Sequence, residues 1–367
     1  MFLLWMFFGL FSSLYGILYF MEYDEFMLAS LDSLIKIIVY LIYFYLLTIN
    51  SDSQSRIKYL MCGLKFGILL NLLWCIADAA MYYTTNVSLT NTVFQRYIQV
   101  TDMRLGMASI TDGFTIRSVG LNNDPATVGL FAIIAAAYSF LIKKPLILIL
   151  AVFASFACVS FTAIVGIVVV TLYYTLFAQK TFKKKLSLIF LIFFLSIVGF
   201  LFLYYSESDI AVSIRTALEL KAAAKVDGAD STEIREFYIR NFFSAVGEIP
   251  ESIFIGTGFN TSSFSYFTLG LGKYEVFRPF DMENTYIATF FDIGAVGLFF
   301  FISFFVSLFN FSKKMMNKNK KDDMSRIMNA TAMGALIAFL FYHYTLYSVL
   351  MYVSIASVLF RPKRLTI

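Results

Sequence analysis

The sequence SESDIAVSIRTALELKAAAKVDGADSTEIREFYIR, residues 206–240, begins a polar segment that continues to Arg278. On both sides of this segment the chain consists of long apolar runs joined by short connections. A polar loop of this length between apolar runs is usually functional rather than a simple connection. The pattern predicts an apolar scaffold that presents the polar segment as the lid or floor of a site.

The composition indicates a membrane protein. Hydrophobic residues make up 59% of the chain and charged residues 14%, whereas soluble domains have roughly half apolar and roughly a quarter charged residues. The cysteines Cys62, Cys75 and Cys158 lie in apolar runs without the spacing of metal ligands, and His343 is the single histidine. A multi-histidine metal site is therefore excluded, and we expect no cofactor. The net charge of +5 comes from short loops, so it implies no nucleic-acid partner.

The apolar runs predict an all-α polytopic membrane protein, a single membrane domain over residues 1–367. A spanning helix needs about 20 mostly apolar residues. The apolar stretch 145–178 is too long for one helix, and we divide it near Ser160. The first run lacks the basic start and cleavage site of a signal peptide, so we expect it to remain as a span. The ten expected spans are 2–20, 31–49, 60–82, 126–142, 145–159, 161–178, 186–205, 287–311, 327–343 and 345–360.

Basic residues in alternate connections predict the orientation. The connection 21–30, the first of those without basic residues, is acidic. Every second connection contains basic residues, which are Arg56, Lys58, Lys143, Lys144, Lys180, Lys183–Lys185, Lys313–Lys321, Arg361, Lys363 and Arg364. The positive-inside rule then puts both ends of the chain in the cytoplasm and the loops 83–118 and 206–286 outside. The longer loop also carries basic residues, but loops beyond about 60 residues escape this rule.

The first outer loop ends in a pattern typical of an anion site. Asp124 and Pro125 predict the start of a helix, with Asp124 as the cap and Pro125 in the first turn. Arg117 precedes them by a few residues, and an arginine beside a helix N-terminus suits phosphate. Binding of a lipid headgroup or of a loop carboxylate explains Arg117 equally well.

The long outer loop contains a predicted amphipathic helix. Asp230-Ser-Thr-Glu233 resembles a capping box, and Gly247 and Pro250 predict the end. At 100° per residue, Arg235 falls in the middle of the apolar face, so the helix should lie on the membrane surface. The apolar residues of this face are Ile234, Tyr238, Ile239, Phe242, Phe243, Ala245 and Val246. Arg235 can extend to a phospholipid, but the cost of an unpaired charge there favours a functional anionic partner. Arg240 lies on the opposite face, where it can pair with Glu236.

Further carboxylates stand where the long loop leads into the next span. Asp281 and Glu283 can cap that helix, which is the commoner role, or act as a base. Asp292 lies about two turns further, where a charge is costly unless it faces a polar cavity. Asn71 and Asp78 share one face of the run 60–82 and should pack against polar neighbours.

Three stretches of the sequence resemble motifs of the O-antigen polymerase (Wzy) and O-antigen ligase superfamily of bacterial envelope glycosyltransferases. The first runs from Arg117-Ser-Val-Gly to Asp124-Pro125, and the second from Arg235 to Gly256-Thr-Gly258-Phe. The third, Glu283-Asn284-Thr-Tyr286 to Asp292-Ile-Gly294-Ala-Val-Gly297, is similar to the family's His-Asn-x-Tyr-Leu and Glu-x-Gly-x-x-Gly.

The chain departs from the family pattern at two places. Glu283 stands where ligases usually have histidine, which favours a polymerase. Ser160-Phe161-Thr162 stands where the family often has Ser-Arg, so one candidate basic residue is missing.

The resemblance implies a metal-independent, inverting transfer of a glycan from undecaprenyl diphosphate to a lipid-linked repeat unit. Arg117 and Arg235 would neutralise the diphosphate, and Glu283 would accept the proton of the acceptor hydroxyl. The other expected substrate contacts are Asp124, Arg240, Arg278, Asn284 and Tyr286. The product would be O-antigen, a part of lipopolysaccharide, or capsule. The expected location is the outer face of the bacterial cytoplasmic membrane, with membrane lipid, chain-length regulators and flippases as partners.

Other functions stay open at this point. An O-antigen ligase would share the fold and the motifs. A polysaccharide flippase or transporter would also be polytopic, but it would more often show internal repeats and charges at the membrane midplane. A structural membrane protein would not need an arginine in the apolar face of a surface helix.

Overall fold

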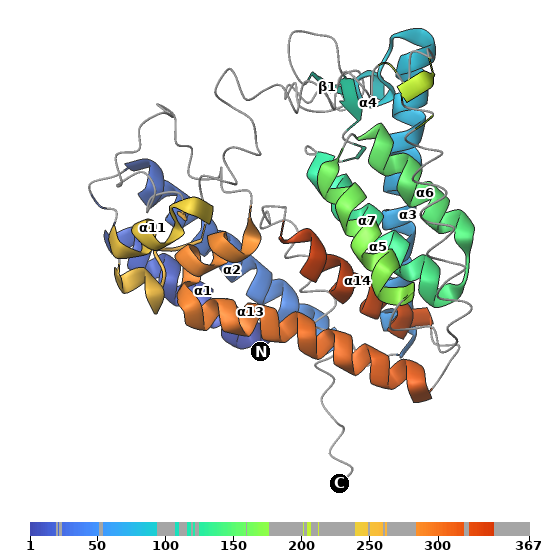
Figure 1. The fold of residues 1–367 in the computed structure, drawn as a ribbon. Coiled ribbons are helices and arrows are strands. Elements are labelled where there is room, and N and C mark those ends of the chain that lie inside the picture. Colours follow the sequence, from blue (N-terminus) through green and yellow to red (C-terminus); the bar gives the residue numbers. More distant parts are fainter. Residues whose placement is uncertain are drawn as a thin grey trace. The chain divides into compact units, whose positions relative to one another are not determined.

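The computed structural model describes most of the expected helices and parts of the outer loops (Figure 1). The described residues are 1–19, 21, 24–50, 54–93, 107–109, 116–118, 120–121, 125–158, 160–175, 201, 204–206, 212, 239–248, 250–259, 261–262, 284–318 and 323–340. They form two compact units. The first contains residues 1–64, 227–311 and 339–367, and the second contains residues 65–226 and 312–338.

The structure is predominantly helical. Its long helices are α1 (Phe2–Tyr19), α2 (Asp24–Asn50), α3 (Gln54–Thr85), α5 (Pro125–Ile142), α6 (Pro145–Ala157), α7 (Phe161–Tyr173), α13 (Thr285–Lys318) and α14 (Asp323–Ala338). The shorter elements are α4 (Leu89–Val93), α11 (Phe242–Glu248) and the 3₁₀ helix η3 (Pro250–Ile253). Among the described residues, the exception to the all-α prediction is a ribbon of two antiparallel strands, β1 (Met107–Ser109) and β2 (Ile116–Ser118), in the predicted loop 83–118.

Four of the described helices are long and apolar enough to cross a membrane: residues 2–19, 26–46, 61–85 and 285–318. The helices α5, α6 and α7 are apolar but shorter. Large apolar side chains on the outer sides of α1 and α2 are exposed, for example Phe7 at 61% and Tyr45 at 63%. A soluble protein rarely exposes so many large apolar groups, whereas lipid tails would cover them.

Several predicted helix ends are confirmed. Pro125 is the first residue of α5, and α11 ends at Glu248, before Pro250. The long apolar stretch is divided at Ser160, whose side chain caps α7 by accepting a hydrogen bond from the Ala163 N–H. Of the predicted span 186–205 the structure describes residues 201, 204 and 205 alone, and the span 345–360 lies outside the described residues, so the ten-helix topology stays a prediction.

Two helices are longer than their apolar runs. The prediction that residues 21–30 form a connection is wrong, because α2 already begins at Asp24. Acidic residues at this start are favourable, because they lie next to the positive dipole end of the helix. Likewise α13 continues past its apolar part to Lys318, and basic residues are favourable in a last turn. Hydropathy indicates only the apolar part of a helix, which lipid can cover, whereas the polar ends of the same helix extend into water.

In the first unit, α1 packs along α2 (Figure 1), and aromatic rings from distant segments pack against both helices. Phe2 lies 5.6 Å from Phe44 and 5.1 Å from Phe304, measured between ring centroids. Trp5 lies 5.1 Å from Phe301 and 5.9 Å from Phe259. These contacts tie α1 to α2, to α13 and to the loop that follows η3.

In the second unit, α5 is the central helix, and α6, α7 and α14 pack around it (Figure 1). The contacts are close because small residues lie at the crossings: Gly166 of α7 lies against Ile133, and Gly334 of α14 lies against Ile134. Small residues let helix backbones approach each other where lipid supplies no hydrophobic drive. At one end of this bundle, Lys65 and Tyr138 both donate to the carboxyl group of Asp323.

Candidate functional site

The helix α13 is interrupted at Gly294, within the third motif stretch. Gly294 has φ 74° and ψ 174°, a conformation outside the helical region. The loop containing Gly256, with φ 76°, lies directly against this break. A Cβ at Gly256 would come closer than 3.0 Å to the Asp292 carbonyl group, and a Cβ at Gly294 would come equally close to that of Phe254. The two segments can therefore meet only as glycine backbones.

The loop supplies the hydrogen bonds that the broken helix lacks. The N–H of Thr257 donates to the Phe291 carbonyl oxygen at 2.9 Å, and the N–H of Gly258 donates to that of Asp292 at 2.8 Å. Carbonyl groups at the end of a helix have no partner within the helix. The stretch 256–258 thus acts as an external cap for the first part of α13.

The Asp292 side chain holds the next part of the same loop. Its Oδ1 atom accepts hydrogen bonds from the N–H groups of Thr261 at 3.1 Å and Ser262 at 2.9 Å. The residue is fully buried, so these bonds offset the cost of removing the carboxyl group from water. The backbone of this loop is the polar partner of the Asp292 side chain, and the polar cavity expected there stays a prediction.

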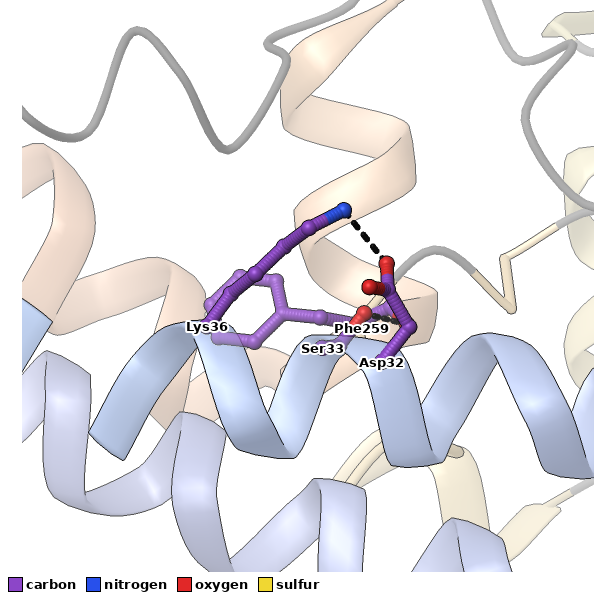
Figure 2. Close-up of polar contacts among 4 residues, drawn as sticks. All are labelled: Asp32, Ser33, Lys36 and Phe259. Carbon is purple, nitrogen blue, oxygen red and sulfur yellow. Dashed lines mark hydrogen bonds and ion pairs between the residues drawn. The ribbon is translucent and has the colours of Figure 1, made fainter. Parts of the chain in front are cut away.

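Small polar residues of α1 and α2 complete the site. We call this site the glycine knot: residues 254–259, 261 and 262 with Asp292–Gly294. Ser12 accepts from the Gly258 N–H at 2.9 Å and donates to the Asp292 carbonyl oxygen. Ser33 of α2 donates to the Phe259 carbonyl oxygen at 3.0 Å, and Figure 2 shows the two residues side by side, with Asp32 and Lys36 paired on the same helix. Three helices, α1, α2 and α13, therefore fix one loop.

The serines of α1 were missed because we interpreted its run only as a span. Gly9, Ser12, Ser13 and Gly16 recur at helical spacing and form one small, polar stripe, to which the loop binds. A Cβ at Gly16 would approach the Thr257 carbonyl oxygen closer than 3.0 Å. The spacing i, i+3, i+4, i+7 is the signal that could have indicated this face.

Asn284 is the N-cap of α13. Its Oδ1 atom accepts from the N–H groups of Tyr286 at 3.0 Å and Ile287 at 3.1 Å, and its Nδ2 atom donates to the Leu340 carbonyl oxygen at 3.1 Å. Both lone-pair sites of the amide oxygen are thereby used, and one N–H donor is left. Tyr286 is partly buried, with its ring 6.4 Å from that of Phe301. The expected contacts of Asn284 and Tyr286 with a substrate stay predictions.

The structure describes the C-terminal end of the predicted amphipathic helix. One part of the apolar face of this end is buried and another part is exposed. Ala245 is buried with Ala288 and Phe291 of α13, and Phe242 packs on the same cluster. Phe243, by contrast, is 85% exposed. Ile239 and Arg240 are also exposed. The face predicted to be apolar thus covers α13 on one side and remains open on the other.

The remaining predicted site residues fall largely outside the described part of the chain. Arg235, Glu283, Arg278 and Asp124 lie outside the described residues. The backbone of Arg117 belongs to β2 and pairs with Ala108 of β1, but its side chain is not among those described. The structure therefore brings the second and third motif stretches together at the glycine knot and leaves the expected catalytic groups as predictions.

Within the described residues, no group of three or more His, Cys, Asp or Glu side chains could hold a metal ion. Comparison of the chain with protein-family models gives no matching family, and comparison with curated proteins gives no relative. The arguments for a function therefore rest on the motifs and on the arrangement of their residues.

Proposed function

We propose that the protein is a polysaccharide repeat-unit polymerase of the O-antigen or capsule type. The observation that supports this function best is the glycine knot, in which Gly256-Thr-Gly258 packs on Asp292-Ile-Gly294. These are parts of the two stretches that resemble the outer loop and the late motif of the polymerase and ligase superfamily. Their contact gives the long outer loop a fixed attachment on α13, the helix that follows Glu283 and Asn284 in the sequence.

The proposed reaction takes place on the outer face of the bacterial cytoplasmic membrane. A hydroxyl oxygen of the lipid-linked acceptor attacks the anomeric carbon of the donor glycan from the side opposite the leaving group. The bond between that carbon and the diphosphate oxygen breaks, undecaprenyl diphosphate leaves, and the configuration is inverted. The proton of the hydroxyl passes to Glu283.

The arginines would stabilise the charge that develops on the leaving group. Arg117 and Arg235 each offer a planar pair of donors that fits phosphate oxygens. Donors fixed in position before the reaction contribute most, because they need no reorganisation as charge develops. The four long apolar helices are suited to hold the polyprenyl tails beside this site.

A polysaccharide flippase is the second candidate, since interrupted helices also form substrate sites in transporters. In those sites the free ends of the broken helix bind the substrate. Here the carbonyl groups of Phe291 and Asp292 already accept hydrogen bonds from Thr257 and Gly258. The broken end is capped by the protein, which favours a structural attachment over a transport site.

Complementation of bacterial strains separates the candidates. In cells that lack their polymerase but keep a flippase and a ligase, the protein should restore long polysaccharide chains. In cells that lack only the ligase, it should leave lipid A core uncapped. Restoration of capping without long chains would instead indicate a ligase, and rescue of a flippase-deficient strain alone would indicate a transporter.

A further inference from the structure

A buried carboxyl group organises the first outer loop of the second unit. Asp78 of α3 is fully buried. Its Oδ1 atom accepts from the Ser88 hydroxyl at 2.9 Å and from the Thr90 N–H at 3.0 Å. Its Oδ2 atom accepts from the Ser118 hydroxyl at 2.9 Å. One side chain thus ties α3 both to the start of α4 and to the end of β2.

A second set of hydrogen bonds joins the two tied segments to each other. The indole N–H of Trp74 donates to the Thr90 hydroxyl at 2.8 Å. The Thr90 hydroxyl lies 3.4 Å from the Gly120 carbonyl oxygen, and the Gly120 N–H donates to the Ser118 hydroxyl at 3.2 Å. A buried network with its members satisfied is rigid, and removal of one member leaves the others unpaired in a low dielectric.

The turn after β2 also packs tightly on α3. Gly120 has φ 63°, and a Cβ there would lie 2.5 Å from the Asn71 side-chain oxygen. Asn71 and Asp78 lie on the same face of α3, as the sequence predicts, so both ends of the stretch 118–120 rest on this face. The position of Ser118 is therefore fixed by α3.

Ser118 directly follows Arg117, the arginine proposed to bind diphosphate. The backbone of Arg117 is fixed on one side by its pairing with Ala108 in the ribbon and on the other by the bond from Ser118 to Asp78. Donors that bind a transition state must be held within a few tenths of an ångström. A carboxyl group that fixes the neighbouring residue can supply this constraint.

We propose that Asp78 is a positioning residue for an anion site at Arg117, which receives the diphosphate group of a polyprenyl diphosphate. The inference rests on the proposed function only in taking Arg117 as the diphosphate ligand. Asp78 itself does not contact the lipid. It acts by holding Ser118, and through Ser118 the backbone of Arg117.

The test is equilibrium binding of undecaprenyl diphosphate to the purified full-length protein, with undecaprenol as the probe that lacks phosphate. Arg117→Ala and Asp78→Ala should each raise the Kd for the diphosphate about tenfold, a loss of about 1.4 kcal/mol. Binding of undecaprenol should not change. The double variant should bind no more weakly than either single variant, because both changes remove the same interaction.

Two further variants separate positioning from general stability. Asp78→Asn keeps an oxygen for Ser88 and Thr90, and its amide N–H can donate to the Ser118 hydroxyl, which then accepts instead of donating. β2 therefore remains tied to α3, and the variant should bind within about threefold of wild type. Asp323→Ala, which removes the group that binds Lys65 and Tyr138, destabilises the same unit and should leave the Kd unchanged. If Asp78→Ala does not yield folded protein, Ser118→Ala removes the single bond to β2 and should weaken diphosphate binding.

The outcomes distinguish this inference from the proposed function. Unchanged diphosphate affinity in Asp78→Ala and in Ser118→Ala, or in Arg117→Ala, would overturn the positioning role. Absence of diphosphate binding by the wild type would overturn it too. A wild-type protein whose diphosphate binding depends on Arg117 and on Asp78 as its positioning residue, but which does not elongate glycans, would leave the inference standing and contradict the polymerase.

Discussion

Gly256 and Gly294 interlock: each has a positive φ, and each lies where a Cβ would collide with the backbone of the other's segment. The loop and the helix break therefore depend on each other, because neither the cap on α13 nor the loop conformation can form without the other.

Gly294→Ala should destabilise the protein by about 3 kcal/mol or more. The backbone conformation at Gly294 is nearly restricted to glycine, which costs about 1–3 kcal/mol for any other residue, and overpacking against Phe254 costs a further 1–3 kcal/mol or so. The measurement is the thermal unfolding midpoint of the purified protein. Gly67→Ala in α3 is the matched control, because a Cβ there meets nothing within 4 Å. A Gly294→Ala variant as stable as the control would contradict the interlock.

Asp292→Ala should unfold at a clearly lower temperature than Asp292→Asn. Alanine leaves the N–H groups of Thr261 and Ser262 buried without an acceptor, at a cost of about 1–3 kcal/mol each. Asparagine keeps an oxygen at the Oδ1 position and so keeps both bonds. Protease resistance of the loop, compared between the two variants, gives a second readout. An equal fall of the unfolding temperature in both variants would mean that the negative charge of Asp292, rather than its hydrogen bonds, holds the loop.

The second unit should lose stability in acid through Asp323. Burial raises the pKa of this carboxyl group, but hydrogen bonds from Lys65 and Tyr138 and the positive charges of Lys65 and Arg326 outweigh burial, so the pKa lies below its usual value of 3.8. A lowered pKa in the folded state gives stability that is fully present above pH 3.8 and is lost as the pH falls through the folded-state pKa. The pair is half-exposed, so the effect should stay below about 1 kcal/mol.

Denaturant unfolding as a function of pH measures this contribution. Asp323→Asn should remove that part of the pH dependence. If the variant loses as much stability in acid as the wild type, other carboxyl groups cause that loss.

Labelling of single cysteines tests the topology. Cysteines at Gly228 and Asn319 should be accessible from opposite sides of the membrane, with Gly228 outside, because basic connections favour the cytoplasm. Impermeant reagents added to intact cells should therefore modify only the first. Modification of both from the same side would overturn the predicted orientation and move the proposed site away from the outer face.

The sequence was most informative where a residue has a strong local preference. Pro125 begins a helix, as its chemistry predicts, the stretch expected to divide near Ser160 divides there, and Pro250 follows the end of α11. These features depend on a few neighbouring residues. The same is true of the apolar runs, which gave the helices α1 to α3, α5 to α7, α13 and α14.

The break at Gly294 could not be predicted in this way. A glycine in an apolar run can mark a close helix contact as readily as an interruption, and only the arrival of Gly256 from a distant loop decides between them. The buried role of Asp78 has the same origin, since its partners Ser88, Thr90 and Ser118 come from separate segments. The break at Gly294 and the role of Asp78 thus depend on contacts between distant segments, which the local sequence pattern does not indicate.

Substitution of the arginines tests the proposed phosphate contacts. Arg117→Ala and Arg235→Ala should abolish chain growth in cells without lowering the protein level, whereas lysine at either position should retain partial activity, because it keeps the charge but not the planar geometry. Arg240→Ala, on the exposed side, should cause a smaller loss. Lys314→Ala, exposed near the end of α13, is the control and should grow normal chains. Normal chain growth in both arginine-to-alanine variants would move the phosphate site elsewhere.

The most direct test of the polymerase is incubation of the purified protein with lipid-linked repeat units, without ATP or nucleotide sugars. Gel electrophoresis of the products should show a ladder that grows by one repeat unit per step, with release of undecaprenyl diphosphate and inverted configuration at each new linkage. Products that stay at a single repeat unit, with wild-type protein that is folded and binds the substrate, would contradict the proposed function.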